Sequence, residues 1–218
     1  MSASAPRTTP RTTPRTAPLR PRRRNAAPDT GRLPLTPQAW IDAATEVLVD
    51  QGIDHVRVDV LAGELNVTRG SFYWHFRDRE DLLRRVLQAW SERSTEQLTK
   101  RLESARSDPR EQLRDVMSLP FRGRAAVRAA RIELAIRAWA RRDEMARQAL
   151  DESDASRIGY HREIFGALGF TPDEAAMRAF VLYSWEVAES LLHRQGSAAQ
   201  RQARREFVEK LVQQRLKR

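Results

Sequence analysis

The sequence of 218 residues predicts an all-α protein: a basic N-terminal arm followed by two helical regions. Three observations support this fold class. Apolar residues after residue 33 recur mostly at the 3.6-residue spacing of a helix. Capping residues, prolines and glycines divide this part of the chain into segments of helical length. The first 32 residues are instead rich in Arg, Pro and Thr, and they contain little that could be buried.

The arm, residues 1–32, carries eight Arg and one Asp. Its prolines and its lack of apolar side chains predict disorder. A targeting signal is disfavoured, because the prolines interrupt any amphipathic helix and no apolar segment follows the Arg cluster. Two interpretations stay open: a solvated tail, or an arm that adds phosphate contacts to DNA.

The first helix is predicted over residues 36–51. Thr36 can cap it, Pro37 suits its first position, and Gly52 can end it in a left-handed conformation. A second short helix follows, with apolar residues from Val58 to Leu65 on one face. Its end marks the start of a sharp turn.

Asn66 tolerates the positive φ that this turn needs, and Thr68 can cap a third helix, Arg69–Phe76. This is the spacing of a helix-turn-helix. Phe72 and Phe76 lie four residues apart and are expected to point inward. The outward positions are left to polar and aromatic residues, namely Arg69, Ser71, Tyr73, Trp74 and His75.

Exposed Tyr and Trp side chains suit a surface that a partner covers, and Gly70 would let a phosphate or a base edge come close. The pattern therefore predicts a helix that enters a DNA major groove. The alternative is that Tyr73 and Trp74 pack against the first or fourth helix. Asp78 and Asp81 are expected to cap the fourth helix, where Arg79 could clamp a phosphate.

The run from Val58 to Leu82, which includes Leu65-Asn66-Val67-Thr68-Arg69-Gly70-Ser71-Phe72-Tyr73-Trp74-His75-Phe76, closely resembles the DNA-binding domain of the TetR (tetracycline-repressor) family. The resemblance covers about a quarter of the chain. It implies a helix-turn-helix domain over residues 33–80 and a helical regulatory and dimerisation domain over residues 81–218. It further implies a homodimeric regulator, usually a repressor, that binds a palindromic operator and is released by a small molecule.

The same resemblance implies individual roles. Thr68, Tyr73, His75 and Arg79 would hold phosphates, and Arg69, Ser71 and Trp74 would face base edges. Two residues depart from the family pattern. Asn66 stands where Gly is usual, and Arg57 stands near a common Thr or Ser, where it either reaches a phosphate or is solvated.

The remaining chain predicts helices near 79–105, 109–118, 124–141, 144–168, 172–195 and 199–216. Aromatic and Met side chains could line an effector pocket: Met117, Phe121, Trp139, Met145, Tyr160, Phe165, Phe180 and Tyr183. The alternative is an ordinary core. Glu133 with Arg137, and Asp154 with Arg157, have helical spacing; they form either solvated pairs or a buried network between helices.

The last two helices are expected to form the dimer interface, as a four-helix contact about a two-fold axis. Its expected residues are apolar or small: Ala179, Val187, Leu191, Phe207 and Leu211. The alternative is a hairpin within one subunit. A dimer would set two recognition helices about 34 Å apart, one turn of DNA.

Other classes of protein find little support. The chain has no Cys, and we expect no cofactor, no metal site and no enzymatic activity, because no phosphate loop, nucleophile motif or metal motif occurs. The lack of Cys fits a reducing compartment, so a cytoplasmic protein is expected, and no apolar run has the length of a membrane span. The alternative function is a nonspecific nucleic-acid-binding or DNA-compacting protein that depends on the basic arm.

Overall fold

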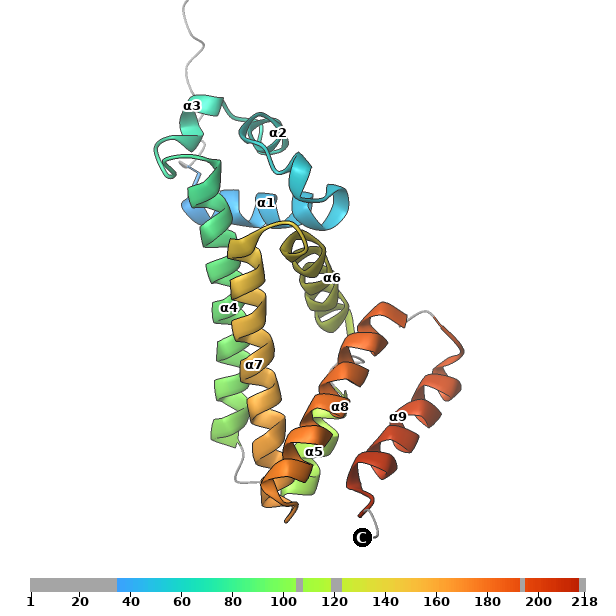
Figure 1. The fold of residues 1–218 in the computed structure, drawn as a ribbon. Coiled ribbons are helices and arrows are strands. Elements are labelled where there is room, and N and C mark those ends of the chain that lie inside the picture. Colours follow the sequence, from blue (N-terminus) through green and yellow to red (C-terminus); the bar gives the residue numbers. More distant parts are fainter. Residues whose placement is uncertain (1–34, 105–107, 119–122, 193–194, 216–218) are drawn as a thin grey trace, which may run out of the picture. The chain divides into compact units, whose positions relative to one another are not determined.

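The computed structural model describes residues 35–104, 108–118, 123–192 and 195–215, without the side chains of 94–104. From Leu35 onward the chain forms one compact unit. The predicted disorder of residues 1–32 concerns a segment outside these described residues. Figure 1 shows the described segments, which contain helices and no strand. The prediction of an all-α fold is confirmed for this part of the chain.

The N-terminal region contains α1 (Pro37–Gln51), the short 3-10 helix η1 (Ile53–His55), α2 (Val58–Glu64) and α3 (Arg69–Phe72). We call this region the head. The long α4 (Arg79–Ser104) begins in the head and leaves it. The sequence did not predict η1. The third helix is also shorter than expected, because a turn replaces helix after Phe72.

Both ends of the first helix are formed as expected. Thr36 accepts a hydrogen bond from the backbone N–H of Ala39 at 3.3 Å. Gly52 has a φ of 86° and donates its N–H to the carbonyl of Leu48 at 3.1 Å. These two caps define α1, and Gly52 allows the chain to leave the helix at a φ that side chains disfavour.

The regulatory half contains α5 (Pro109–Ser118), α6 (Gly123–Ala140), α7 (Glu144–Ala167), α8 (Pro172–Leu192) and α9 (Ala198–Gln213). These bounds agree with the predicted helices to within a few residues at the ends. In Figure 1, α7 runs beside α4, and the two helices pack together. Helix α7 also contacts α5, α6 and α8, so it is the central helix of this half.

Two apolar clusters hold the fold together. The first is continuous from the head into the regulatory half, and it includes Trp40 of α1, Phe72 of α3, Ile136 of α6 and Leu150 of α7. The second joins α5, α7, α8 and α9. Because the first cluster contains residues of the head, of α4, and of α6 and α7, the head packs directly against the regulatory half. None of the described helices has the length and apolarity needed to cross a bilayer.

Candidate nucleic-acid interface

The recognition segment, residues 68–77, is anchored in the core by two buried phenylalanines. Phe72 is fully buried and Phe76 is 2% exposed. Their rings stack with centroids 5.2 Å apart, and Trp40 of α1 meets Phe72 edge-on at 5.3 Å. Such aromatic pairs favour these geometries. The prediction that both phenylalanines point inward is confirmed.

The turn before this segment is set by Asn66, whose φ is +53°. It is the one residue other than glycine with a positive φ in the described part of the chain. Asn tolerates this conformation better than most side chains. The N–H of Val67 then returns to the carbonyl of Ala62 at 2.9 Å, which locks α2 to the turn. The expected left-handed turn at Asn66 is therefore present.

The outer side of the segment is open to solvent. Trp74 is 86% exposed and Tyr73 is 57% exposed, so neither packs into the core. Thr68, Arg69 and Gly70 are exposed as well, and Ser71 and His75 are half-buried. The alternative in which Trp74 packs against a neighbouring helix is wrong. Tyr73 does touch the edge of Phe72, at 5.2 Å between centroids.

No contact inside the protein requires a glycine at position 70. A Cβ at this position would meet Thr68 Oγ1 at 3.7 Å, which is an ordinary contact. Its φ is not in the left-handed region either. The expected capping bond from the Thr68 side chain is absent, so that hydroxyl is not used to start α3. Both residues thus present small groups to the outside.

Arg79 differs from the expectation. Its Nε donates to the carbonyl of Val56 at 2.5 Å, and its Nη2 donates to the carbonyl of Ile53 at 2.7 Å. The guanidinium is partly buried in these contacts. We therefore revise the expected phosphate clamp: Arg79 ties the start of α4 to the loop between α1 and α2.

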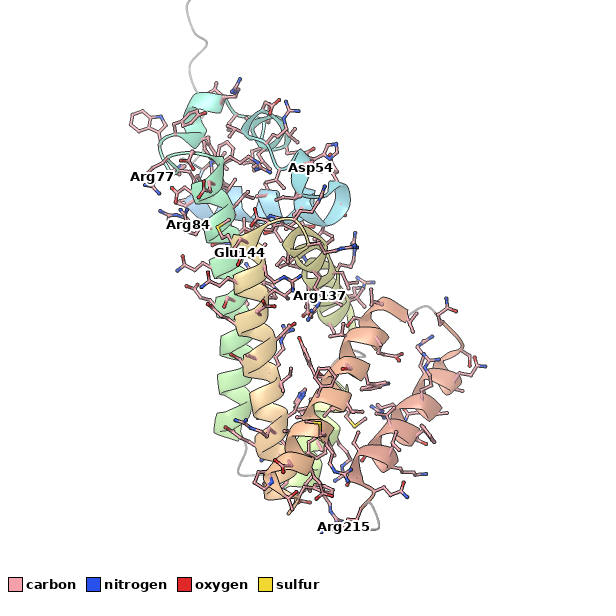
Figure 2. All side chains as sticks on the ribbon, in the orientation of Figure 1. Asp54, Arg77, Arg84, Arg137, Glu144 and Arg215 are labelled. Carbon is pink, nitrogen blue, oxygen red and sulfur yellow. The ribbon has the colours of Figure 1, made fainter. Side chains whose placement is uncertain are left out.

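Arg77 was overlooked as a site residue and is better suited to a phosphate. Its side chain is 79% exposed at the turn that leads into α4 (Figure 2). Its backbone N–H donates to the Asp81 carboxylate at 3.1 Å, and this bond, with nearby arginines, holds the pKa of Asp81 below its usual value. Asp78 accepts from the N–H of Asp81 at 2.8 Å, so the predicted pair of capping aspartates is present.

Arg57 lies beside the head at the start of α2. Its guanidinium makes two bonds to Asp59, at 3.1 and 2.7 Å, on an exposed surface. The hydrogen bonds from Arg57 lower the pKa of the Asp59 carboxyl group. An exposed guanidinium with a local partner is compatible with both interpretations of Arg57, a phosphate contact and a solvated side chain.

The residues expected to line an effector pocket are dispersed. Met117, Tyr160 and Phe165 belong to the second apolar cluster, whereas Trp139 belongs to the first. Phe180 is 60% exposed, so its assignment to an interior pocket is wrong. Met145 packs on the first cluster, and Phe121 lies outside the described residues. Most of these side chains form ordinary core.

Tyr183 belongs to a network of charged side chains between helices. Arg137 of α6 donates to Glu133 at 2.9 Å and to Asp154 of α7 at 2.8 Å. Arg157 donates to Glu133 at 2.7 Å, and the Tyr183 hydroxyl of α8 donates to Asp154 at 2.6 Å. Figure 2 shows Arg137 projecting from α6 among these helices. The buried-network alternative is confirmed over the solvated face.

Burial opposes the charged form of Arg137, but its bond to Asp154 and the charge of Glu133 outweigh this, so its pKa is raised. Burial also raises the pKa of Tyr183, despite the positive charge of Arg157. The hydroxyl thus stays protonated at neutral pH and can donate. The network joins α6, α7 and α8 rigidly.

The residues expected at the dimer interface lie on α8 and α9 and differ in their exposure. Ala179 is fully buried inside the subunit, so its assignment to the interface is wrong. Leu191, Phe207 and Leu211 are exposed, at 60%, 66% and 48%, and Val187 is half-buried. Phe180 joins this exposed set. With Met177 and Val181 they form the apolar face of α8 and α9.

Comparison with known proteins agrees with this geometry. Residues 41–86 match the family model of bacterial regulatory proteins of the tetR family. The regulator SrpR of Pseudomonas putida is 46% identical over 52 residues, which are 24% of this chain and 24% of SrpR. The regulator AcrR of Shigella flexneri is 35% identical over 51 residues, 23% of this chain and 24% of AcrR. The matched segment thus spans about a quarter of these relatives.

Solved structures resemble the whole fold. A transcriptional regulator from Rhodococcus sp. Rha1 has a TM-score of 0.63 and 20% identity, covering 82% of this chain and 92% of that protein. The regulator FadR of Bacillus subtilis, solved with stearoyl-CoA, has a TM-score of 0.57 and 19% identity, covering 80% and 96%. The similarity at this level concerns the fold, including the helical half beyond residue 86.

Proposed function

We propose that this chain, which carries the N-terminal helix-turn-helix of the tetR family of bacterial regulatory proteins, is a ligand-responsive transcriptional regulator. In this proposal it binds a palindromic DNA operator as a homodimer and acts as a repressor that a small molecule releases. Its place of action would be the cytoplasm, where its DNA lies.

The observation that carries the proposal is the recognition segment. Its inner side is fixed by Phe72 and Phe76, and its outer side exposes Trp74 at 86%. A large apolar side chain held in solvent, in the turn directly after a helix that is anchored in the core, suits a surface that a partner covers. Arg69 is also exposed, and its guanidinium is a group that can pair with guanine in a bidentate way, while Trp74 could touch a thymine methyl.

The other contacts follow from position on the segment. We propose that Thr68, Tyr73 and His75 hold phosphates, together with the newly identified Arg77. Ser71 would meet a base edge, and Gly70 would admit the DNA backbone. Contacts of the first kind set the position of the protein on the duplex, while contacts of the second kind select the sequence.

The effector remains chemically open in this proposal. Similar folds were solved with stearoyl-CoA, with choline and with imidazole. These compounds share neither charge nor size, so similarity of fold supports an effector without naming its class. The charged network around Arg137 and Tyr183 could transmit its effect, because it joins three helices of the regulatory half.

Selection of bound duplexes from a random DNA pool tests this function. We expect one enriched palindrome whose half-sites are about one helical turn apart. Arg69→Ala should weaken its binding by about 1–3 kcal/mol and relax the preference at one position in each half-site. Fluorescence anisotropy with single-position operator variants would measure both effects.

Arg84→Ala is the matched control, because Arg84 lies on α4 and pairs with Glu80 at 2.8 Å. This change should leave the sequence preference intact. If no palindrome is enriched, and affinity depends on salt alone, the protein is a nonspecific nucleic-acid binder and the proposal fails.

A further inference from the structure

A cavity of about 780 Å³ lies where α1 of the head meets α6, α8 and α9. Its volume is within the range of small-molecule sites. It is separate from the aromatic core positions first expected to bind an effector, none of which lines it. The cavity therefore needs its own explanation.

The lining of the cavity is strongly basic. It contains five arginines and two glutamates: Arg124, Arg128, Arg131, Arg201, Arg205, Glu46 and Glu189. Both glutamates already have partners, because Glu46 pairs with Arg128, and the buried Glu189 accepts from Arg204 at 3.0 Å. Arg124 makes no ion pair with another described residue. The positive charge at the cavity thus exceeds the negative charge within it.

Two helix starts add to this positive potential. Helix α6 begins with Gly123 and Arg124, and α9 begins at Ala198, which lines the same cavity. The N-terminal end of a helix carries a partial positive charge. The arginines and the helix ends therefore favour the same kind of ligand, an anion.

The rest of the lining is apolar. Val49 of α1 and Val127 and Ile132 of α6 contribute side chains to it, and Val127 is 45% exposed. An inorganic anion would leave this apolar surface exposed to water. A ligand with both a negative group and an apolar body would match the arginines and the valines together.

We infer that this cavity binds an organic anion with an apolar body, and that its occupation loosens the head from the regulatory half. The second part of the inference rests on the proposed regulatory function. The reason lies in two ion pairs: Arg128 of α6 pairs with Glu46 of α1, and Arg131 pairs with Asp50 at 2.7 Å. Both arginines line the cavity.

A bound anion would compete with Glu46 and Asp50 for the same two guanidinium groups. Two of the contacts that join α1 to α6 would weaken, and the two heads of a dimer would lose their fixed spacing. By linkage, operator DNA would then weaken the binding of the anion by the same factor by which the anion weakens the binding of DNA.

Isothermal titration calorimetry on the full-length protein, without DNA, tests the site. The probe is naphthalene-1-sulfonate, and naphthalene-1-sulfonamide is its uncharged counterpart of similar shape. We expect the sulfonate to bind about tenfold more tightly or better, because charge-assisted hydrogen bonds are roughly twice as strong as neutral ones. Equal binding of the two compounds would overturn the inference.

Arg124→Gln should weaken the sulfonate about fivefold or more and leave the sulfonamide unchanged, since the lost interaction involves charge. This variant should fold normally, because Arg124 is exposed and makes no ion pair with the described residues. Arg110→Gln on α5 is the control, and it should bind both probes as the wild type does. Unchanged sulfonate binding by Arg124→Gln would contradict the assignment.

The effect on DNA is measured separately, by anisotropy with the selected duplex. Added sulfonate should lower the affinity of the wild-type protein and affect the Arg124→Gln variant less. If Arg124→Gln weakens DNA binding without any probe, Arg124 contacts DNA instead and the site is refuted. If the sulfonate binds with no effect on DNA, the proposed loosening is refuted. Absence of any preferred duplex would count against the proposed function alone.

Discussion

Arg77 and Arg79 stand two residues apart at the start of α4, yet their side chains have different surroundings. Arg77 is 79% exposed, whereas Arg79 donates to the carbonyls of Val56 and Ile53. The sequence offers the same residue type at both positions. The difference arises because the segment after α1 places two backbone carbonyls next to the start of α4, within reach of Arg79. The residues around Arg77 and Arg79 in the sequence do not indicate this contact.

Arg79→Ala should therefore reduce stability. Two partly buried carbonyls would lose charged donors, and such bonds contribute about 1.5–3 kcal/mol each at most. We expect a loss of about 1–3 kcal/mol in the free energy of unfolding, measured by urea denaturation followed by circular dichroism.

Arg77→Ala is the comparison, and its stability should stay within about 0.5 kcal/mol of the wild type, as for most surface substitutions. Its affinity for every DNA sequence should fall alike, if Arg77 contacts a phosphate. An Arg79→Ala protein of unchanged stability but weakened DNA binding would restore the phosphate role that we have revised.

At the scale of elements, α8 shows how one helix serves two surfaces. Successive residues on a helix point about 100° apart, so Ala179 and Phe180 face different directions. Ala179 packs against the second apolar cluster, and Phe180 is 60% exposed. The sequence predicted an apolar helix correctly. It assigned these two neighbours to the wrong sides, because both faces of α8 carry apolar residues.

Phe180→Glu should dissociate the proposed dimer. The change introduces a charge on the apolar face of α8 and α9, where burial without a partner is costly. Sedimentation velocity should show a monomer at concentrations where the wild type is dimeric. Operator affinity should fall as well, because a single head reads only one half-site.

Val127→Glu provides a matched control, since Val127 is also an exposed apolar residue but lies on α6. It should remain dimeric. A Phe180→Glu protein that still sediments as a dimer would show that another surface holds the subunits together.

At the scale of the whole molecule, the structure shows where acidic residues of the head find their partners. Residues 33–90 carry six Arg and nine acidic residues. Four of these acids follow α1 and η1 at intervals of four: Asp42, Glu46, Asp50 and Asp54. Each pairs with an arginine from outside α1 and η1, namely Arg93, Arg128, Arg131 and Arg142 respectively. These four negative charges are thus paired with arginines outside α1 and η1 and help to hold the head to the rest of the protein.

The arm carries eight Arg in its first 32 residues, which lie outside the described part. Deleting residues 1–32 should leave the selected palindrome preferred, because the residues proposed to contact bases lie in the head. The dependence of log K on log salt should become shallower, by about 0.9 for each phosphate contact removed. Anisotropy titrations between about 50 and 200 mM salt would measure this slope.

An unchanged slope would identify the arm as a solvated tail. Loss of all sequence preference on deletion would instead favour the alternative of a nonspecific binder, in which the arm is the main contact.

The pattern of residues close together in the sequence was sufficient to predict the α-helices and the caps at Thr36 and Asp78. It was also sufficient to predict the turn at Asn66 and the inward orientation of Phe72 and Phe76. These features depend on spacing and on residues close in sequence, so they can be predicted before any fold is known. The partners of Arg79, the network of Arg137, the exposure of Phe180 and the basic cavity were decided by tertiary structure alone. Each depends on groups from helices far apart in the chain, and only packing brings such groups within the few ångströms over which hydrogen bonds and ion pairs act.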